Sequence, residues 1–390
     1  MQFDKIHNRI GTNSVKWDSL PSAYGVLPDE AIPMWIADME FQAPEAVIKC
    51  ISQLAEHGIY GYSREDDEYR QAICGWMERR HQWHIHPESL SSTHGTVNSI
   101  ALLIQAFTNP GDGVVIFTPV YHAFSRIIRA SGRQIIESPL VKNASGKYQM
   151  DFEATAEYLT GNEKMLLLCS PHNPGGRVWS AKELEEAALF AQRHNLLIVS
   201  DEIHHDLVYS GYTHRPFEKA VPSAKPYLVT LTSASKTFNI PSMHTGNVII
   251  QDTKLRKQFD DVLQVLAISP NSFGVAMTKA AYNEGEKWLG QLLIYLEKNK
   301  ALFDSRINQI YGLSSMPLES TYLAWVDYRS LNLSLSDYKK KIEEKSKVIA
   351  SHGEVFGTGG QGFMRFNIAM PLQMLDSALD RLQVAFSDSE

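Results

Sequence analysis

A strand, a helix and a second strand can be recognised in the middle of the chain, and this pattern limits the fold more than any other feature. Residues 165–169 form a short apolar run, and Leu196–Ser200 form another. Between them Ser180 and Glu183 have the spacing of a capping box and precede an apolar stripe with helical spacing. Alternation of short apolar strands with helices predicts a mostly parallel sheet covered by helices, which is an α/β fold.

The same alternation continues on both sides of this unit, and then it stops. Further expected elements are strands at 114–118, 227–232 and 247–250 and a helix at 98–107. After residue 283 the chain shows long charged helices, a strand-like stretch at 321–327 and a glycine-rich segment at 356–367. We therefore predict a large domain at 41–283 and a smaller α+β domain at 284–390, with residues 1–40 packing on the smaller one.

The charge and hydrophobicity of the chain argue against nucleic-acid and membrane partners. A net charge of -7 gives no attraction to phosphate backbones or to anionic lipid. No apolar run approaches the roughly 18 residues that a membrane span needs. Because the N-terminus has no basic segment followed by an apolar one, we expect a cytoplasmic protein.

Neither a disulfide framework nor a metal site is expected. The three cysteines are widely spaced and form no Cys-x-x-Cys pair. The segment His81–His86 contains three histidines, but no nearby acid or cysteine completes a ligand set, and Arg79 and Arg80 would repel a cation.

Four polar or aromatic residues follow the expected strands, each close to the point where a strand ends. These residues are Tyr121, Asn173, Asp201 and Lys236. In open α/β sheets the ligand binds at the carboxyl ends of the strands. We therefore expect these four residues to converge on one site, although they are far apart in the sequence.

This set of side chains matches what pyridoxal phosphate needs from a protein. The amine of Lys236 can hold the cofactor aldehyde as a Schiff base, and Asp201 can keep the pyridine nitrogen protonated. Asn173 and His204 can contact the phenolate oxygen, and Tyr121 can stack on the ring. The cofactor would then withdraw electrons from the substrate Cα.

A phosphate site is expected at the start of the helix near residue 98. The backbone amides of Gly95, Thr96 and Val97 open this helix, where N–H groups are unpaired and the helix dipole favours an anion. The hydroxyl groups of Ser233 and Ser235 could contribute as well.

Each of these residues also has an ordinary explanation when it is taken alone. Lys236 could be a solvated surface lysine, Asp201 a helix cap, Asn173 a turn residue and His204 a buried imidazole. The glycine run at 357–362 lacks the Lys-Ser/Thr of a phosphate loop, and a surface loop is expected there. Because all these residues occur together, in the order that a cofactor site needs, the cofactor site is favoured over the separate explanations.

Through these residues the chain resembles the fold-type I pyridoxal-phosphate enzymes, which form the aspartate aminotransferase superfamily. Within this superfamily it is most similar to the MalY/PatB-type cystathionine β-lyases. The phrases that carry the resemblance are Gly11–Asp18, Met34–Met39, Gly58–Tyr62, Pro171–Trp179, Ser200–His204, Ser235–Ile240 and Gly359–Arg365. It implies a seven-stranded sheet in the large domain. It also implies cleavage of cystathionine or another S-substituted cysteine to a thiol, pyruvate and ammonia.

The resemblance implies the same roles for the four strand-end residues and adds a substrate site. Arg365 would bind the substrate α-carboxylate, because a guanidinium can hold two oxygens at once. Ala37, Asn173 and Tyr121 would lie beside the substrate. Lys236 would act twice, as the covalent anchor and as the general base, with Asp201 and Tyr121 completing the catalytic set.

A homodimer is also implied, in which Tyr62, or else Tyr60, reaches the cofactor phosphate of the neighbouring subunit. The chain departs from related sequences at three places. His244 stands where aminotransferases of the superfamily carry arginine, Pro241–Met243 replaces Ala-Gly-Leu of the lyases, and Met370 replaces a cysteine.

His244 favours the lyase over the alternative, a class I/II aminotransferase. A cofactor-binding regulator with little catalysis is a third possibility, and the complete set of site residues argues against it as the sole function.

Overall fold

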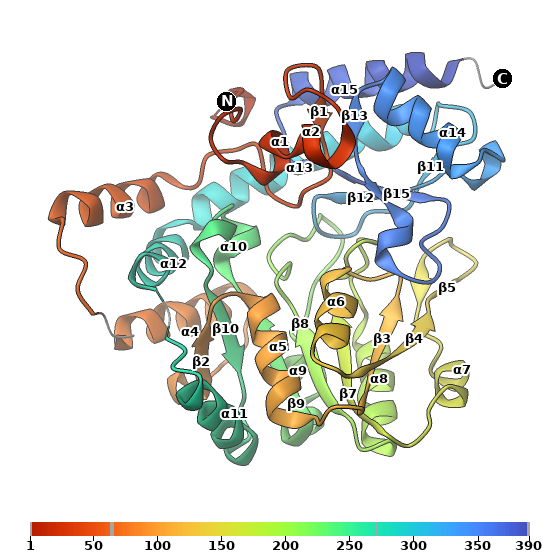
Figure 1. Ribbon diagram of the computed structural model, residues 1–390. Coiled ribbons are helices and arrows are strands. Elements are labelled where there is room, and N and C mark those ends of the chain that lie inside the picture. The colour runs from red at the N-terminus through yellow and green to blue at the C-terminus, as the bar shows by residue number, and fades with distance from the viewer. Residues whose placement is uncertain (1, 63–65, 270, 388–390) are drawn as a thin grey trace.

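Residues 2–62, 66–269 and 271–387 are described by the computed structural model of the chain. Figure 1 shows two layers: a large sheet with its helices below, and a smaller group of helices and strands above. The N-terminal segment belongs to the upper layer in this view, where it lies close to the C-terminal helix.

The large sheet has seven strands in the order β2-β10-β9-β8-β7-β3-β4. The strands are β2 (Leu90–Thr93), β3 (Gly113–Thr118), β4 (Gln134–Pro139), β7 (Glu163–Cys169), β8 (Leu197–Asp201), β9 (Leu228–Thr232) and β10 (Gly246–Ile249). β10 pairs antiparallel with both of its neighbours, and the pairs from β9 to β4 are parallel. The prediction of a mostly parallel seven-stranded sheet is confirmed.

Helices cover both faces of this sheet. The helices of this part of the chain are α4 (Asp67–His81), α5 (Thr96–Phe107), α6 (Ala123–Ala130), α7 (Phe152–Glu157), α8 (Ala181–Arg193), α9 (Phe217–Ala220) and α11 (Thr253–Val265), together with α10 (Ala234–Thr237) after the end of β9 and α12 (Ser272–Glu284), which packs on α3 (Glu45–His57) and α4. Val115 packs toward α8 and Val114 toward α5, because successive strand side chains point to opposite faces. The predicted capping box of α8 is present: Ser180 Oγ accepts from the Glu183 amide at 3.2 Å, and Glu183 accepts from the Ser180 amide at 2.8 Å.

The upper layer contains an antiparallel sheet in the order β11-β12-β15-β14. Its elements are β11 (Ser314–Ser315), β12 (Leu323–Asp327), β14 (Ser351–His352), β15 (Phe363–Asn367), α13 (Glu286–Ile307), α14 (Leu335–Lys339) and α15 (Leu372–Phe386). The strand expected at 321–327 begins only at Leu323, because Thr321 has a φ of 68°, which is outside the β region. Among the described residues, no helix has the length and apolar character that crossing a membrane requires.

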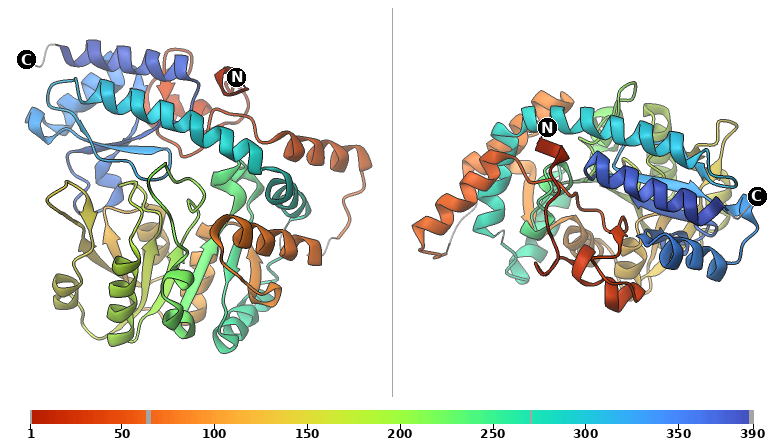
Figure 2. Two further views of the ribbon diagram at one scale, coloured as in Figure 1. Left: turned by 180° about the vertical axis from the view of Figure 1, so that it is seen from behind. Right: turned by 90° about the horizontal axis from the view of Figure 1, so that it is seen from above.

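The N-terminal segment is paired with the C-terminal part of the chain. It contains α1 (Val15–Asp18), α2 (Leu20–Tyr24) and β1 (Ile32–Pro33), and β1 pairs in parallel with β13 (Val348–Ile349). Seen from above in Figure 2, this segment lies alongside α15. The domain limits at residues 40 and 283 stay a prediction.

Two further elements lie apart from the sheets. Helix α3 (Glu45–His57) projects from one side of the molecule, as Figure 1 shows. The short hairpin of β5 (Val141–Lys142) and β6 (Tyr148–Gln149) lies beyond the end of β4.

A buried carboxylate connects the two layers. Glu319, which is 2% exposed, precedes β12. It accepts hydrogen bonds from Arg177 Nε at 3.0 Å and from the Val178 amide at 2.8 Å, and Lys147 Nζ lies 2.7 Å away. Arg177 lies in the turn after β7, so this pair fixes the turn against the upper layer.

We expect Glu319→Gln to lower the free energy of unfolding by about 3 kcal/mol, because Arg177 would remain buried without this counter-charge. Urea unfolding of the full chain measures the change. The matched control is Glu186→Gln, which removes an exposed pair with Lys182 and should cost less than about 0.5 kcal/mol. Equal losses in both variants would contradict the expectation.

Candidate active site

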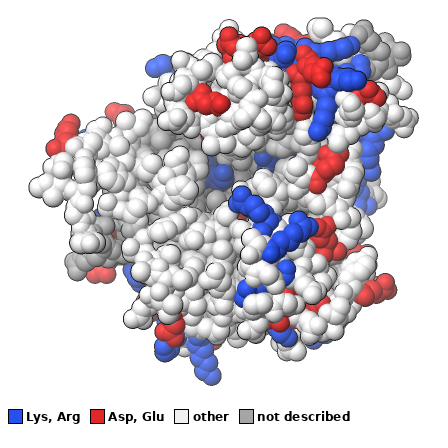
Figure 3. Space-filling model, in the orientation of Figure 1, with Lys and Arg blue, Asp and Glu red and all other residues white. Residues whose placement is uncertain are grey.

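A cavity of about 260 Å³ lies between the two layers, at the carboxyl ends of the parallel strands. Figure 3 shows the molecule hollowed at this level, with basic side chains inside the hollow and at its edge. The lining residues are Ala37, His94, Gly95, Thr96, Val97, Tyr121, Cys169, Asn173, Asp201, Ile203, His204, Ser235, Lys236, Pro241 and His244. The sheet topology therefore brings distant parts of the sequence into one space.

Most residues selected from the sequence line this cavity, and three do not. Ser233 lies below it: its hydroxyl donates to the Thr245 carbonyl at 2.6 Å and caps α10. Arg365 lies behind the lining residue Asn173, to which it donates a hydrogen bond. Tyr62 is fully exposed on the surface. Its expected role concerns a second subunit, and it stays a prediction.

Lys236 is held inside the cavity by the main chain of the N-terminal segment. It lies on α10, directly after β9, and its Nζ donates to the Ala37 carbonyl at 2.7 Å. Burial lowers the pKa of Lys236 to about 8; Arg365 contributes in the same direction, while Asp38 and Asp201 oppose the shift. A substantial fraction of this amine is therefore neutral, and so nucleophilic and basic, near pH 8.

Asp201 is a buried carboxylate with few partners. It is the last residue of β8, is 3% exposed, and accepts a hydrogen bond from the Ile203 amide at 3.3 Å. Burial raises the pKa of Asp201 to about 7, and Glu202 adds to the effect, while Lys236 opposes it. A cationic group brought next to this carboxylate would favour its ionised form.

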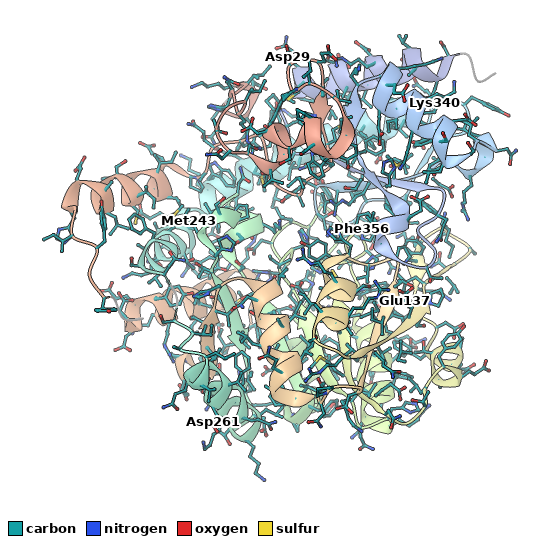
Figure 4. The ribbon with its side chains drawn as sticks, in the orientation of Figure 1. Asp29, Glu137, Met243, Asp261, Lys340 and Phe356 are labelled. Carbon is teal, nitrogen blue, oxygen red and sulfur yellow. The ribbon has the colours of Figure 1, made fainter. Side chains whose placement is uncertain are left out.

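Arg365 is buried with part of its guanidinium unpaired. From β15, its Nη1 donates to Asn173 Oδ1 at 3.0 Å and its Nη2 donates to the Trp35 carbonyl at 2.7 Å. The guanidinium carbon lies 4.9 Å from the ring centroid of Phe356, which Figure 4 labels beside the hollow. The Nε group has no hydrogen-bond partner among the residues that the structure describes, and burial lowers the pKa of Arg365 to about 10. An anionic ligand would supply the missing acceptor.

Residues 35–41 pass between the layers as a strap without regular secondary structure, and side chains from both layers hold its carbonyl groups. Asn367 Nδ2 donates to two of these oxygens at 2.7 and 2.5 Å, and Asn239 Nδ2 donates to two others at 3.0 and 2.7 Å. The Tyr322 hydroxyl donates to the Ala37 carbonyl at 3.0 Å. The strap thus fixes the acceptor that the site lysine uses.

Several residues at the site were missed by reasoning from the sequence. Tyr322 and Asn367 lie in the upper layer, where no local pattern pointed to the cavity. Cys169 is the last residue of β7 and could have been selected by the same strand-end rule that selected Asp201. His94 immediately precedes the expected phosphate-binding amides.

A buried network of charged and polar groups supports the turn that carries His204. Asp206 accepts from Trp76 Nε1 at 3.1 Å and from Thr237 Oγ1 at 2.8 Å. Its carboxylate oxygens also lie 2.8 Å from His81 Nε2 and 3.1 Å from His205 Nε2.

These contacts explain why His81, His205 and Asp206 cluster with their ligand atoms within 4.8 Å of one another. Burial opposes ionisation of Asp206, but His205 and its hydrogen bond hold the pKa of this carboxyl well below its usual range. Asp206 in turn raises the pKa of His205 against the effect of burial. The cluster is therefore held by an internal ion pair.

Comparison with known proteins places the chain in a family. The sequence matches the model described as Aminotransferase class I and II over residues 32–382, and the chain belongs to this family. It is 38% identical to cystathionine beta-lyase PatB of Bacillus subtilis, over 99% of this chain and 100% of that protein. It is 32% identical to protein MalY of Escherichia coli K12, over 97% of this chain and 96% of that protein.

A solved structure shows the same relationship. The crystal structure of cystalysin from Treponema denticola, which contains pyridoxal 5'-phosphate, matches with a TM-score of 0.95 and 32% identity, covering 100% of this chain and 99% of the other. The resemblance and the fold class inferred from the sequence are confirmed.

We expect Asp206→Asn to lower the free energy of unfolding by about 3 to 5 kcal/mol at pH 7, because the substitution leaves His205 buried without its counter-charge. The stabilisation by ionised Asp206 is fully present above the pKa that this carboxyl has in the unfolded chain, and it is lost as the pH falls through its lower pKa in the folded chain. The difference in stability between the variant and the wild type should therefore shrink in acid. Urea unfolding at several pH values measures it. Asp261→Asn, which breaks an exposed pair with Lys257, is the control and should change stability little.

Proposed function

We propose that the protein is a pyridoxal-phosphate-dependent carbon–sulfur β-lyase, which cleaves cystathionine or another S-substituted cysteine to a thiol, pyruvate and ammonia. The observation that carries the proposal is that buried Lys236, whose pKa is lowered to about 8, and buried Asp201, whose pKa is raised to about 7, line one cavity at the carboxyl ends of the strands. Two of the similar proteins support it: PatB is named a cystathionine beta-lyase, and the crystal structure of cystalysin contains pyridoxal 5'-phosphate.

The residues that line the cavity, together with Arg365 behind Asn173, fit this cofactor. Two buried polar atoms, His204 Nδ1 and Arg365 Nε, have no hydrogen-bond partner among the described residues. Among the described residues the Asp201 carboxylate accepts one hydrogen bond, from the Ile203 amide, so it can still pair with the ring nitrogen of the cofactor. Tyr121 offers an aromatic face, and Asn173 offers an amide for the phenolate oxygen.

Each residue of the site has a separate role in this reaction. When bound, pyridoxal phosphate supplies a carbon that bonds an amine and a ring that accepts electrons from the substrate Cα. Lys236 Nζ would hold the cofactor and, as a free amine, would accept the proton from the substrate Cα. Arg365 binds and orients the substrate carboxylate through its fork of N–H groups, with Asn173 beside it. Ala37, in the strap at 35–41, lines the same cavity.

An aminotransferase of the same family is the alternative. It would use Lys236, Asp201 and Arg365 in the same positions, and the two reactions differ only after the Cα proton is removed. Free thiol and pyruvate formed without a keto acid distinguish the lyase from the aminotransferase.

The proposal includes a cytoplasmic homodimer. The segment after α3 exposes Ile59, Tyr60 and Tyr62 by 74%, 65% and 113%. Large apolar side chains exposed together are typical of a surface that another chain covers. A second copy packed there would bring Tyr62, or else Tyr60, toward the neighbouring cofactor phosphate.

We expect the purified protein to form pyruvate from cystathionine or from a bulkier S-substituted cysteine without an added keto acid. Lys236→Ala should lower the rate by more than about 1000-fold, because both the anchor and the base are removed. Coupled lactate dehydrogenase measures pyruvate, and Lys225→Ala in the turn before β9 is the control. Transfer of an amino group to a keto acid with no pyruvate from any thioether would contradict the lyase proposal.

We expect Asp201→Asn to stabilise the cofactor-free chain while impairing the enzyme. The folded pKa of about 7 exceeds the ordinary value of 3.8, so ionisation of the wild-type carboxyl destabilises the fold increasingly as the pH rises between these values. At pH 8 the variant should gain on the order of 4 kcal/mol, and below pH 4 almost nothing.

Urea unfolding at both pH values, together with pyruvate formation by the loaded enzyme, tests this expectation. A variant less stable than wild type at pH 8 would argue against a buried, poorly compensated carboxylate.

A further inference from the structure

Four charged side chains fasten the strap at 35–41 to the chain that precedes it. Arg9 and Lys16 come from the region of α1, and Asp38 and Glu40 come from the strap. Lys16 is fully buried, and its Nζ lies 2.6 Å from Glu40 Oε1. Arg9 Nη1 lies 3.0 Å from the same oxygen. These four residues form the strap cluster, in which two basic groups face two acidic ones.

Asp38 is the member of the strap cluster that directly follows Ala37, whose carbonyl accepts from Lys236. Arg9 binds the Asp38 carboxylate with both ends of its fork: Nη1 donates to Oδ1 at 3.1 Å and Nη2 donates to Oδ2 at 2.8 Å. Lys16 Nζ donates to the Asp38 carbonyl at 3.1 Å. A bidentate pair fixes the orientation of a carboxylate as well as its position. The side chain and the main chain of Asp38 are therefore both held.

The site amine lies close to this residue. Lys236 Nζ is 2.7 Å from the Ala37 carbonyl oxygen. Standard peptide dimensions then put the Cα of Asp38 within about 6 Å of Nζ. The Asp38 side chain is 18% exposed, so water screens its charge only in part. A displacement of Asp38 would also displace the Ala37 carbonyl, because one planar peptide group joins the two residues.

The charges that face Lys236 come from several elements. Burial lowers the pKa of Lys236 to about 8, and Asp38 opposes this shift more strongly than Asp201 does, while Arg365 adds to it. His204 also faces the amine, but burial holds the pKa of this imidazole well below its usual range, so it is neutral. The proposed function assigns Asp201 to the ring nitrogen of the cofactor. Asp38 is then the acid left to stabilise an ammonium at Lys236.

Asp38 is itself an anion over the pH range in which Lys236 titrates. Burial opposes ionisation of Asp38, but Lys16, Arg9 and Lys236 hold the pKa of this carboxyl below its usual range. The Tyr322 hydroxyl is the other titratable group that faces it. Burial, followed by the charge of Asp38, raises the pKa of Tyr322, so this hydroxyl stays protonated.

We propose that Asp38 is a positioning residue for Lys236, because it holds the Ala37 carbonyl against the site amine and keeps a carboxylate charge near it. When Lys236 accepts the proton from the substrate Cα, it becomes an ammonium, which this charge stabilises. The role in the reaction rests on the proposed function. The effect on the amine itself needs no cofactor, and so it can be tested separately.

The test measures the proton affinity of Lys236 in the full chain freed of cofactor. A trace of acetic anhydride acetylates only the neutral form of an amine, and mass spectrometry of the Lys236 peptide gives the rate at each pH. Added phenylalanine, an amine of known pKa, is the internal standard. The wild-type midpoint should lie near pH 8. Asp38→Asn should move it by about one pH unit toward acid, because the charge that favours the ammonium is lost.

The direction of the shift separates this role from a merely structural one. If the substitution only loosened the strap and admitted water, the pKa of Lys236 would rise toward its ordinary value of 10.5, and the midpoint would move toward alkali. Asp38→Glu keeps the charge and should restore a midpoint close to that of the wild type.

Glu40→Gln is the matched control, because it removes the other acid of the strap cluster. Its carboxylate contacts Lys16 and Trp17 and lies two residues further along the strap. The midpoint of Lys236 should stay within about 0.3 pH unit of the wild-type value.

A double variant keeps the test valid if Asp38→Asn does not fold. Arg9→Gln/Asp38→Asn removes both members of the bidentate pair and leaves no guanidinium without its partner. It should also shift the midpoint toward acid, by about half a pH unit, because the nearer of the two charges is the negative one.

An acid shift confined to the variants that lack the Asp38 carboxylate supports the inference. An unchanged midpoint or an alkaline shift in these variants overturns it, and so does an equal acid shift in Glu40→Gln. None of these results decides the proposed function, which fails if the loaded wild-type enzyme forms no pyruvate from any thioether.

Discussion

The site depends on keeping a lysine amine out of water while leaving it a single main-chain acceptor, the Ala37 carbonyl at 2.7 Å. Removing an ammonium group from solvent disfavours its charge, and the nearby guanidinium of Arg365 adds to this effect. The fold meets the requirement by closing two layers over α10, with the strap between them. Burial in the same cavity also disfavours the ionised form of Asp201 and raises its pKa. The pKa values of Asp201 and Lys236 are therefore far closer together than they would be in water.

Much of this arrangement could be predicted from the sequence, because parallel strands follow a simple rule. The apolar runs that became β7, β8 and β9 end at or just before Asn173, Asp201 and Lys236, and the carboxyl ends of neighbouring parallel strands meet at one edge. The capping box of α8 was equally predictable, since it depends on two residues that are three positions apart in the sequence. Such features are local or are imposed by the sheet.

The contributions of the upper layer were not predictable from local pattern. Arg365 was placed only through family resemblance, and Tyr322 and Asn367 were not selected at all. Their roles arise where β12 and β15 meet the strap, more than 280 residues away along the chain. Periodicity and turn chemistry describe neighbours in sequence, whereas these contacts depend on how the two layers dock. The expected strand at 321–327 began late for a similar reason: the left-handed backbone of Thr321 belongs to the junction between layers.

The pairing of β1 with β13 has a consequence for how the protein is made. β1 and the strap that follows it are translated long before their partners, which lie in β13 for β1 and in β15 for the strap. The sheet of the lower layer can form while the chain is still growing, but Ala37 cannot be fixed before the final strands appear. The pocket can therefore be completed only after β15 has been translated, and a product truncated before β15 would contain Lys236 without the environment that lowers its pKa.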